Sequence, residues 1–238
     1  MQAQLQLADI TVSVTWKDIK NVHLSVHPPM GRVTIAAPLR MKLDTIRVFA
    51  ISKLGWIRQQ QQHFRAQERE TPREFLNRES HHVFGRRVLL HVVEEDAPPR
   101  VEAGHHRLTL YVRPGWDLDQ KESLLERFFR DQIRAVMPML LAKWEPILGV
   151  RTEAVFVQRM KTKWGSCNPS ARTIRLNTDL AKKPRECLEY IVVHELVHLL
   201  EPTHNARFLM LMDRFIPKWQ SHRDTLNSLP LRHEDWEY

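Results

Sequence analysis

The 238-residue sequence has only two cysteines, Cys167 and Cys187, and no long run of apolar residues. Two cysteines are too few for a disulfide framework, and neither lies in a zinc-ribbon spacing. Residues 1–20 lack both a basic start and a continuous apolar stretch, so we expect no signal peptide. The most apolar segment, residues 191–200, is too short to span a bilayer. We therefore expect a cytoplasmic protein, not bound to membranes, whose cysteines are thiols.

Charge of one sign is in moderate excess, with 36 Lys and Arg against 28 Asp and Glu and a formal net charge of +8. The basic clusters Arg86–Arg87, Lys161–Lys163 and Lys182–Arg185 are short and lie beside expected turns, which is typical of solvated surface. Weak nucleic-acid association through this basic surface stays open. The pairs His81–His82 and His105–His106 have no ligand spacing to a third partner and are interpreted as surface residues.

One motif carries most of the chemical information: His194-Glu195-Leu196-Val197-His198, with His204 six residues later. On a helix, His194 and His198 lie one turn apart on one face, and Glu195 is rotated from them by about 100°. Glu195 can therefore border a metal ion that the histidines bind. This spacing indicates a zinc-dependent hydrolase, with one zinc ion per chain.

The setting of the motif supports a metal, because its three polar side chains are the only ones between Ile191 and Leu200. Burying two imidazoles and a carboxylate without partners is unfavourable by several kcal/mol, and a bound cation satisfies them. Pro202 ends the helix, and a turn there lets His204 approach the same ion. Glu201 is the alternative third ligand or a residue that orients a ligand.

Three segments resemble the YgjP-like family of zinc metallopeptidases, relatives of the SprT-like and WLM zincins. They are Gly31–Val33 with Ala37–Pro38 and Ser52–Ile57, then Lys163-Trp164-Gly165-Ser166-Cys167, then Tyr190–His198. The resemblance implies zinc ligands at His194, His198 and His204 and a catalytic acid/base at Glu195. The family usually has Arg where this chain has Lys163, so this position cannot form the bidentate hydrogen bonds that an arginine makes with a carboxylate.

We expect an α+β fold, in which a zincin-like catalytic domain with an HExxH active-site helix follows a small β-rich N-terminal domain. The expected domains are residues 1–115 and 116–238. Residues 1–115 predict a hairpin around the turn at 28–31, a helix over 45–66 capped by Asp44, and strands near 88–93 and 108–112. Residues 116–238 predict a long helix from Asp119 to Trp144, kinked at Pro138, and a helix over 206–219.

A strand over 154–160, the loop Lys163–Cys167 and a strand over 173–177 precede the metal helix. Zincins place a sheet edge beside the metal in this order, and an exposed edge can pair with an extended peptide. The sequence does not show which strand forms that edge, and residues 174–177 are the candidate nearest to the helix. We expect polypeptide to be the substrate. The candidate substrate-binding residues are Lys163, Trp164, Gly165 and Ser166, and the candidate oxyanion donors are Lys163, Tyr190 and His222.

The predicted function is a zinc metallopeptidase in which Glu195 accepts the proton of a zinc-activated water. Two alternatives remain: a zinc-stabilised DNA- or protein-binding module without peptidase activity, and a zinc hydrolase of a non-peptide bond. A thiol mechanism at Cys167 is a weaker alternative, because the metal explains the histidines better.

Overall fold

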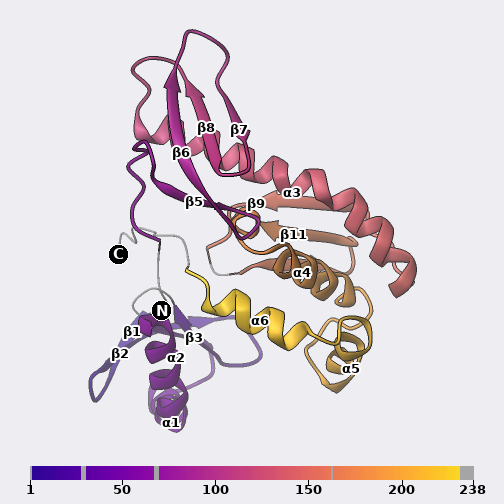
Figure 1. Cartoon of the computed structure of the whole chain (residues 1–238). Coiled ribbons are helices and arrows are strands. Elements are labelled where there is room, and N and C mark those ends of the chain that lie inside the picture. The colour runs from indigo at the N-terminus through magenta and orange to yellow at the C-terminus, as the bar shows by residue number, and fades with distance from the viewer. Residues whose placement is uncertain (1, 28–30, 67–69, 162, 231–238) are drawn as a thin grey trace. The chain divides into compact units, whose positions relative to one another are not determined.

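The computed structural model describes residues 2–27, 31–66, 70–161 and 163–230. The chain divides into two compact units, unit 1 (Met1–Arg69) and unit 2 (Glu70–Tyr238), each described below by itself (Figure 1). The division expected after residue 115 falls inside unit 2, because the strands before residue 115 share a hydrophobic core with the helices after it.

Unit 1 is a four-stranded sheet covered by two helices. The strand order is β1-β2-β4-β3, with β2 and β4 parallel and the two outer pairs antiparallel. Alternating apolar residues of β2, such as Val12 and Val14, pack against Ile46 and Ile57 of the helices, and all four are at most 1% exposed. The elements are β1 (Gln2–Leu7), β2 (Ile10–Lys17), β3 (His23–His27), β4 (Arg32–Pro38), α1 (Leu43–Ser52) and α2 (Leu54–Ala66).

The single helix expected over residues 45–66 is interrupted at Lys53, whose φ of −106° and ψ of 3° are not helical. Gly55, a weak helix former, lies two residues further on. Asp44 does not cap the helix, which begins at Leu43 and has Lys42 as its N-cap residue. The expected pairing of residues 23–27 with 32–36 is confirmed, and the tip of the turn at 28–30 lies outside the described residues.

In unit 2, a second four-stranded sheet packs against one long helix. The strand order is β5-β6-β8-β7, and the helix α3 contributes Phe129 and Ile133, each at most 1% exposed, to the shared core. Asp117 caps the helix in a reciprocal capping box with Gln120, so the cap residue lies two positions before the expected Asp119 and the helix begins at Leu118. The elements are β5 (Ser80–Val83), β6 (Arg86–Glu94), β7 (Arg100–Ala103), β8 (Arg107–Val112) and α3 (Leu118–Leu148).

A three-stranded sheet of order β10-β11-β9 follows, with β9 (Ala154–Gln158), β10 (Gly165–Asn168) and β11 (Thr173–Asn177). Residues 174–177, the candidate for the exposed edge, do not form it, because β11 is paired on both sides. Ile174 and Leu176 are fully buried, so their apolar alternation reflects the burial of a central strand. The edge strands are β9 and β10, and β10 contains the Gly-Ser-Cys part of the expected loop.

The remaining elements surround the motif: η1 (Thr178–Lys182), α4 (Arg185–Val197), α5 (Ala206–Phe215) and α6 (Trp219–Ser228). Helix α4 is buried on nearly every side. The helix expected over residues 206–219 ends at Phe215, and Pro217 separates it from α6. Among the described residues, no helix is long and apolar enough to cross a membrane.

A buried ion-pair network centres on Lys182 at the end of η1. Its Nζ lies 2.9 Å from Oε2 of Glu70 and 3.1 Å from Oδ1 of Asp179. Arg73 lies 3.2 Å from the same oxygen of Glu70. Burial alone would raise the pKa of Glu70, but the charges of Lys182 and Arg73 outweigh it and lower this pKa to about 2.

We expect Glu70→Gln to remove an acid-sensitive part of the stability. Because the pKa of Glu70 is lowered in the fold from 4.5 to about 2, its carboxylate stabilises the fold above pH 4.5, and this contribution disappears as the pH falls toward 2. The variant should lose on the order of 3 kcal/mol at neutral pH and progressively less in acid.

Urea unfolding of both proteins from neutral pH down to about pH 3 measures this difference. The exposed Glu74→Gln is the matched control and should change little at any pH. A deficit in Glu70→Gln that does not shrink in acid would contradict the assignment.

Candidate metal centre

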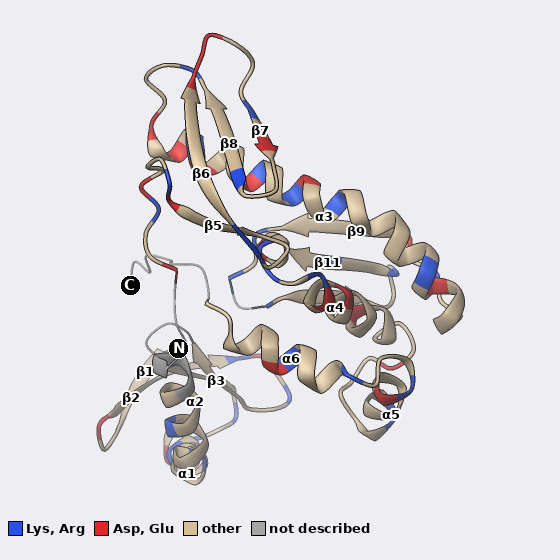
Figure 2. Ribbon diagram, viewed as in Figure 1, with Lys and Arg blue, Asp and Glu red and all other residues tan. Residues whose placement is uncertain are grey.

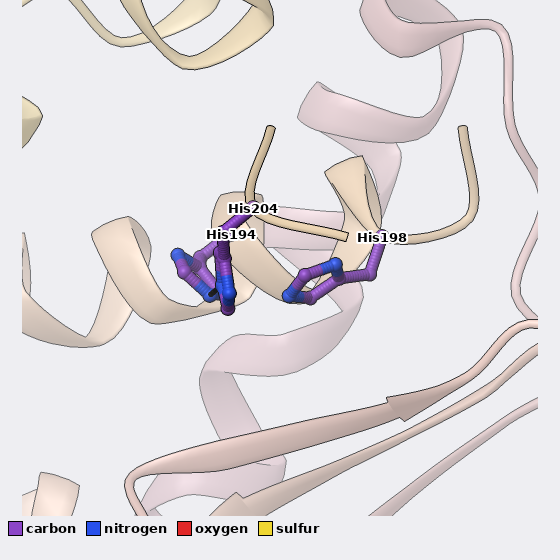
Figure 3. Close-up of side chains that lie close together, drawn as sticks. All are labelled: His194, His198 and His204. Atoms are coloured by element: carbon purple, nitrogen blue, oxygen red, sulfur yellow. Dashed lines mark hydrogen bonds between the residues drawn. The ribbon is translucent and has the colours of Figure 1, made fainter. Parts of the chain in front are cut away.

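Three histidines from two segments meet at the C-terminal end of α4. His194 lies in the last turn of α4, His198 is its C-cap residue, and His204 lies just before α5. The chain leaves the helix through a turn that contains Pro202 and brings His204 back. One nitrogen of each ring lies within 4.8 Å of the others (Figure 3). The structure thus brings together the three histidines that the sequence predicted as ligands.

The spacing of these nitrogens fits a metal ion. Nε2 of His194 and Nε2 of His204 lie 3.0 Å apart. Two nitrogens bound tetrahedrally to zinc at about 2.0–2.1 Å would be separated by roughly 3.3 Å, so a small adjustment admits the ion. Nδ1 of His194 is buried and has no hydrogen-bond partner in the described part of the chain.

Burial favours the neutral form of His194 and His198, which is the form that binds metals. Burial, together with the neighbouring His198 and His204, lowers the pKa of His194 to about 3. Burial likewise lowers the pKa of His198, although the hydrogen bond to Glu201 opposes this effect.

Glu201 acts on this cluster through its backbone. Its carbonyl oxygen lies 3.1 Å from Nδ1 of His198, so Nδ1–H donates to it and Nε2 is left free to bind a metal. The carboxylate of Glu201 instead accepts from the hydroxyl of Thr203 at 3.0 Å. Among the described residues, the cluster with ligand geometry contains the three histidines and not Glu201.

Phe208 contacts all three imidazoles, a role that the sequence did not predict. Its ring centroid lies 4.9 Å from that of His194 and 4.7 Å from those of His198 and His204. The side chain is 2% exposed and comes from the first turn of α5, whose N-terminus is capped by Asn205. The cap therefore fixes the platform on which the three rings rest.

Glu195 is buried beside the histidines and lies directly against the backbone of β10. The side chain is 4% exposed, and its Oε2 has no hydrogen-bond partner in the described residues. Burial raises its pKa to about 8, although the charge of Lys163 opposes this shift. A Cβ atom on Gly165 would lie only 2.6 Å from Oε1 of Glu195. Glycine is thus required for the carboxylate to occupy this position.

A cleft of about 520 Å³ opens onto the histidines and Glu195. Tyr190 and His222 are not among the residues that line it, so Lys163 is the one predicted oxyanion donor that does. Cys167 also lines the cleft, and burial together with Glu195 raises the pKa of its thiol to about 11, which disfavours a thiolate nucleophile. The four predicted substrate-binding residues all line it: Lys163, Trp164, Gly165 and Ser166.

The free edge of β10 borders this cleft. The backbone N–H of Asn177 donates to the carbonyl of Trp164 at 2.9 Å, so Trp164 is a hydrogen-bonded position of the antiparallel pair. Since such positions alternate, the N–H and C=O groups of Gly165 and Cys167 point away from β11. The Asn177 side chain also donates to the carbonyls of Met160 and Lys163, at 2.8 and 2.9 Å, and so fixes the segment leading into β10.

The sequence model of the YgjP-like family, a metallopeptidase domain, matches residues 20–229, which is most of the chain. The chain belongs to the YgjP-like metallopeptidase family. The resemblance of its motifs is thereby confirmed, and this YgjP-like protein is a hydrolase of the metallopeptidase class.

Two solved structures are similar to parts of this YgjP-like chain. The metallopeptidase zymogen abylysin of Pyrococcus abyssi is 24% identical, over 37% of this chain and 90% of its own, with a TM-score of 0.35. The metallopeptidase zymogen jannalysin of Methanocaldococcus jannaschii is 21% identical, over 40% of this chain and 92% of its own, with a TM-score of 0.34. The comparison with curated proteins found no match.

We expect Gly165→Ala to impair catalysis more than stability. The added methyl group would meet the Glu195 carboxylate and displace it, and a displacement of about 1 Å can reduce turnover by roughly 100-fold. Peptidase assays and thermal unfolding measure the two effects. The control is Gly55→Ala, where a Cβ meets nothing within 4 Å and activity should be unchanged. Full activity in Gly165→Ala would show that the contact is unimportant.

His204→Ala and Glu201→Gln distinguish the two candidates for the third ligand. Because His204 offers a ring nitrogen to the cluster and the carboxylate of Glu201 does not, His204→Ala should weaken zinc affinity by more than about 100-fold. Glu201→Gln keeps the backbone carbonyl that orients His198 and should stay within about threefold of the wild type. Competition with a zinc chelator measures both, and the reverse order of effects would assign the ligand to Glu201.

Proposed function

We propose that this protein is a zinc-dependent peptidase of the zincin type, with α4 as its active-site helix and one zinc ion held by His194, His198 and His204. One observation carries the proposal: the three clustered histidines and the buried Glu195, whose Oε2 has no hydrogen-bond partner among the described residues, open into the same cleft as a free strand edge. Zinc bound there would supply a Lewis acid that polarises the scissile carbonyl and lowers the pKa of a bound water to about 7.

Glu195 is the general base and acid of this proposal. Its side chain lies one residue after His194 and borders the ligands without joining them. The carboxylate accepts a proton from the attacking water and donates it to the leaving amine. Burial suits it to this exchange, because a carboxylate with few hydrogen-bond donors around it gains a proton readily.

Polypeptide is the proposed substrate class because the cleft offers backbone hydrogen-bonding groups. An extended chain can pair with the outward N–H and C=O groups of Gly165 and Cys167 and so present a peptide bond to the metal. Trp164 and Ile191 supply apolar walls. Lys163 is the exposed cation of the cleft and is suited to stabilising developing negative charge on the substrate carbonyl oxygen.

The free strand edge also favours a peptidase over the two alternative functions. A zinc-stabilised binding module needs neither Glu195 nor an open cleft, and structural zinc usually has four protein ligands. A hydrolase of a non-peptide bond would use the same metal and base but has no need of unpaired backbone groups along β10. Both alternatives remain measurable outcomes of the test below.

Glu195→Gln tests the mechanism. The variant keeps the size of the side chain and all three histidines, so it should retain about one zinc per chain, while its peptide hydrolysis should fall by roughly 100- to 10,000-fold. Metal content and cleavage of a broad peptide library are measured on the same samples. Glu201→Gln is the matched control and should keep both properties.

Three outcomes would overturn the proposal in different ways. Zinc in both proteins with cleavage by neither would favour the binding module. Zinc with hydrolysis of another bond class alone would favour the non-peptide hydrolase. Equal cleavage by wild type and Glu195→Gln would show that Glu195 is not the general base.

A further inference from the structure

Outside the metal centre, the fold gathers basic side chains from three distant segments at one end of the second sheet. They come from the start of β6, the turn before β8 and the first residue of α4. We define the arginine-histidine patch as Arg86, Arg87, His105, His106, Arg107 and Arg185, all of which are exposed.

Specific contacts bring these segments together. The backbone N–H of Phe84 donates to the carbonyl of Ala181 at 2.7 Å, and that of Gly85 donates to Lys182 at 3.2 Å. Gly85 has a φ of +76° and lies so close to Pro184 that a Cβ would be 3.0 Å from its Cα. The β5–β6 turn is thereby held against the start of α4, which makes two basic clusters of the sequence neighbours in space.

The third segment joins through the pairing of β6 with β8. Leu89 donates its backbone N–H to the carbonyl of His106 at 2.9 Å, and Nη1 of Arg86 lies 3.4 Å from Nδ1 of His105. Backbone hydrogen bonds therefore hold the three basic segments next to one another.

The arginines of the patch contact neutral groups. Arg87 donates to the hydroxyl of Ser80 at 2.9 Å, and Cζ of Arg185 lies 4.6 Å from the ring centroid of Phe84. Within the described ranges, no carboxylate forms an ion pair with Arg86, Arg87 or Arg107. Their charges are available to an external anion.

Acidic residues of the same sheet lie at its opposite end. Glu94, Glu95 and Asp96 follow one another at and just after the end of β6, and Glu95 forms an ion pair with Arg100 there. Figure 2 shows this separation, with red along the connection between β6 and β7 and blue where β6 and β8 begin. A long anion would therefore meet attraction at the patch and repulsion at the far end.

We propose that the arginine-histidine patch binds single-stranded nucleic acid. Guanidinium groups match phosphate oxygens bidentately. His105 and His106 present exposed rings at 4.5 Å in an edge-to-face arrangement, and unpaired bases stack on such rings. An acidic peptide would use the charges but has no use for the rings. The proposal is independent of the peptidase chemistry.

Fluorescence anisotropy with an oligothymidylate of about 20 nucleotides, at several salt concentrations, tests the proposal on the full chain. The patch variant is Arg86→Gln/Arg87→Gln/Arg107→Gln. The matched control, Arg113→Gln/Arg127→Gln/Arg151→Gln, removes three exposed arginines elsewhere in unit 2. Each variant removes three charges from the formal net charge of +8, which leaves +5.

The patch variant should bind at least about 10-fold more weakly, and its slope of log affinity against log salt should be smaller by about 2. The control should stay within about twofold, and both should keep the thermal midpoint of the wild type. His105→Ala/His106→Ala should weaken binding of the oligonucleotide by about fivefold or more and leave binding of polyglutamate unchanged.

Equal losses in the patch variant and the control would overturn the proposal, because net charge alone would then explain binding. So would absence of binding in the wild type, or polyglutamate competing as well as the oligonucleotide.

Discussion

The burial of Glu195, beside the half-buried His194 and His198 at the end of an apolar helix, is the constraint on which the rest of unit 2 depends. Helix α4 is buried on nearly all sides, so the polar groups of the motif meet few water molecules. Within the described chain, Nδ1 of His194 and Oε2 of Glu195 have no hydrogen-bond partner. Such orphaned polar groups are costly unless a ligand satisfies them. A water bound to a metal ion at the histidines would satisfy the carboxylate of Glu195.

Neighbouring residues fit closely around these groups. Gly165 leaves space for the Glu195 carboxylate, and Phe208 forms the platform beneath the three imidazoles. Asn177 fixes the segment that leads into β10 through two backbone carbonyls. The same strand that confines the carboxylate presents its free edge to the cleft, so the position of the base and the docking of a peptide depend on one backbone.

The cluster of three histidines beside Glu195 was predictable because the spacing and apolar setting of these residues are local properties of one helix and the turn after it. The roles of Gly165 and Phe208 were not, since they depend on contacts with residues 30 and 4 to 14 positions away. Residues 174–177 were the candidate for the free edge because they lie nearest to the metal helix along the chain, but neither this position nor their apolar alternation shows which neighbours a strand has. The boundary expected at 115 failed to match the compact units for a related reason: a change from strands to helices does not reveal a shared core.

The central claim is that three imidazoles of this chain bind one zinc ion beside an unbound Glu195. X-ray absorption spectroscopy at the zinc edge of the metal-loaded protein tests it most directly. The account predicts about three imidazole nitrogens and one oxygen at roughly 2.0–2.1 Å. A sulfur ligand near 2.3 Å, which would bring Cys167 into the site, would contradict it, as would a protein that retains no zinc.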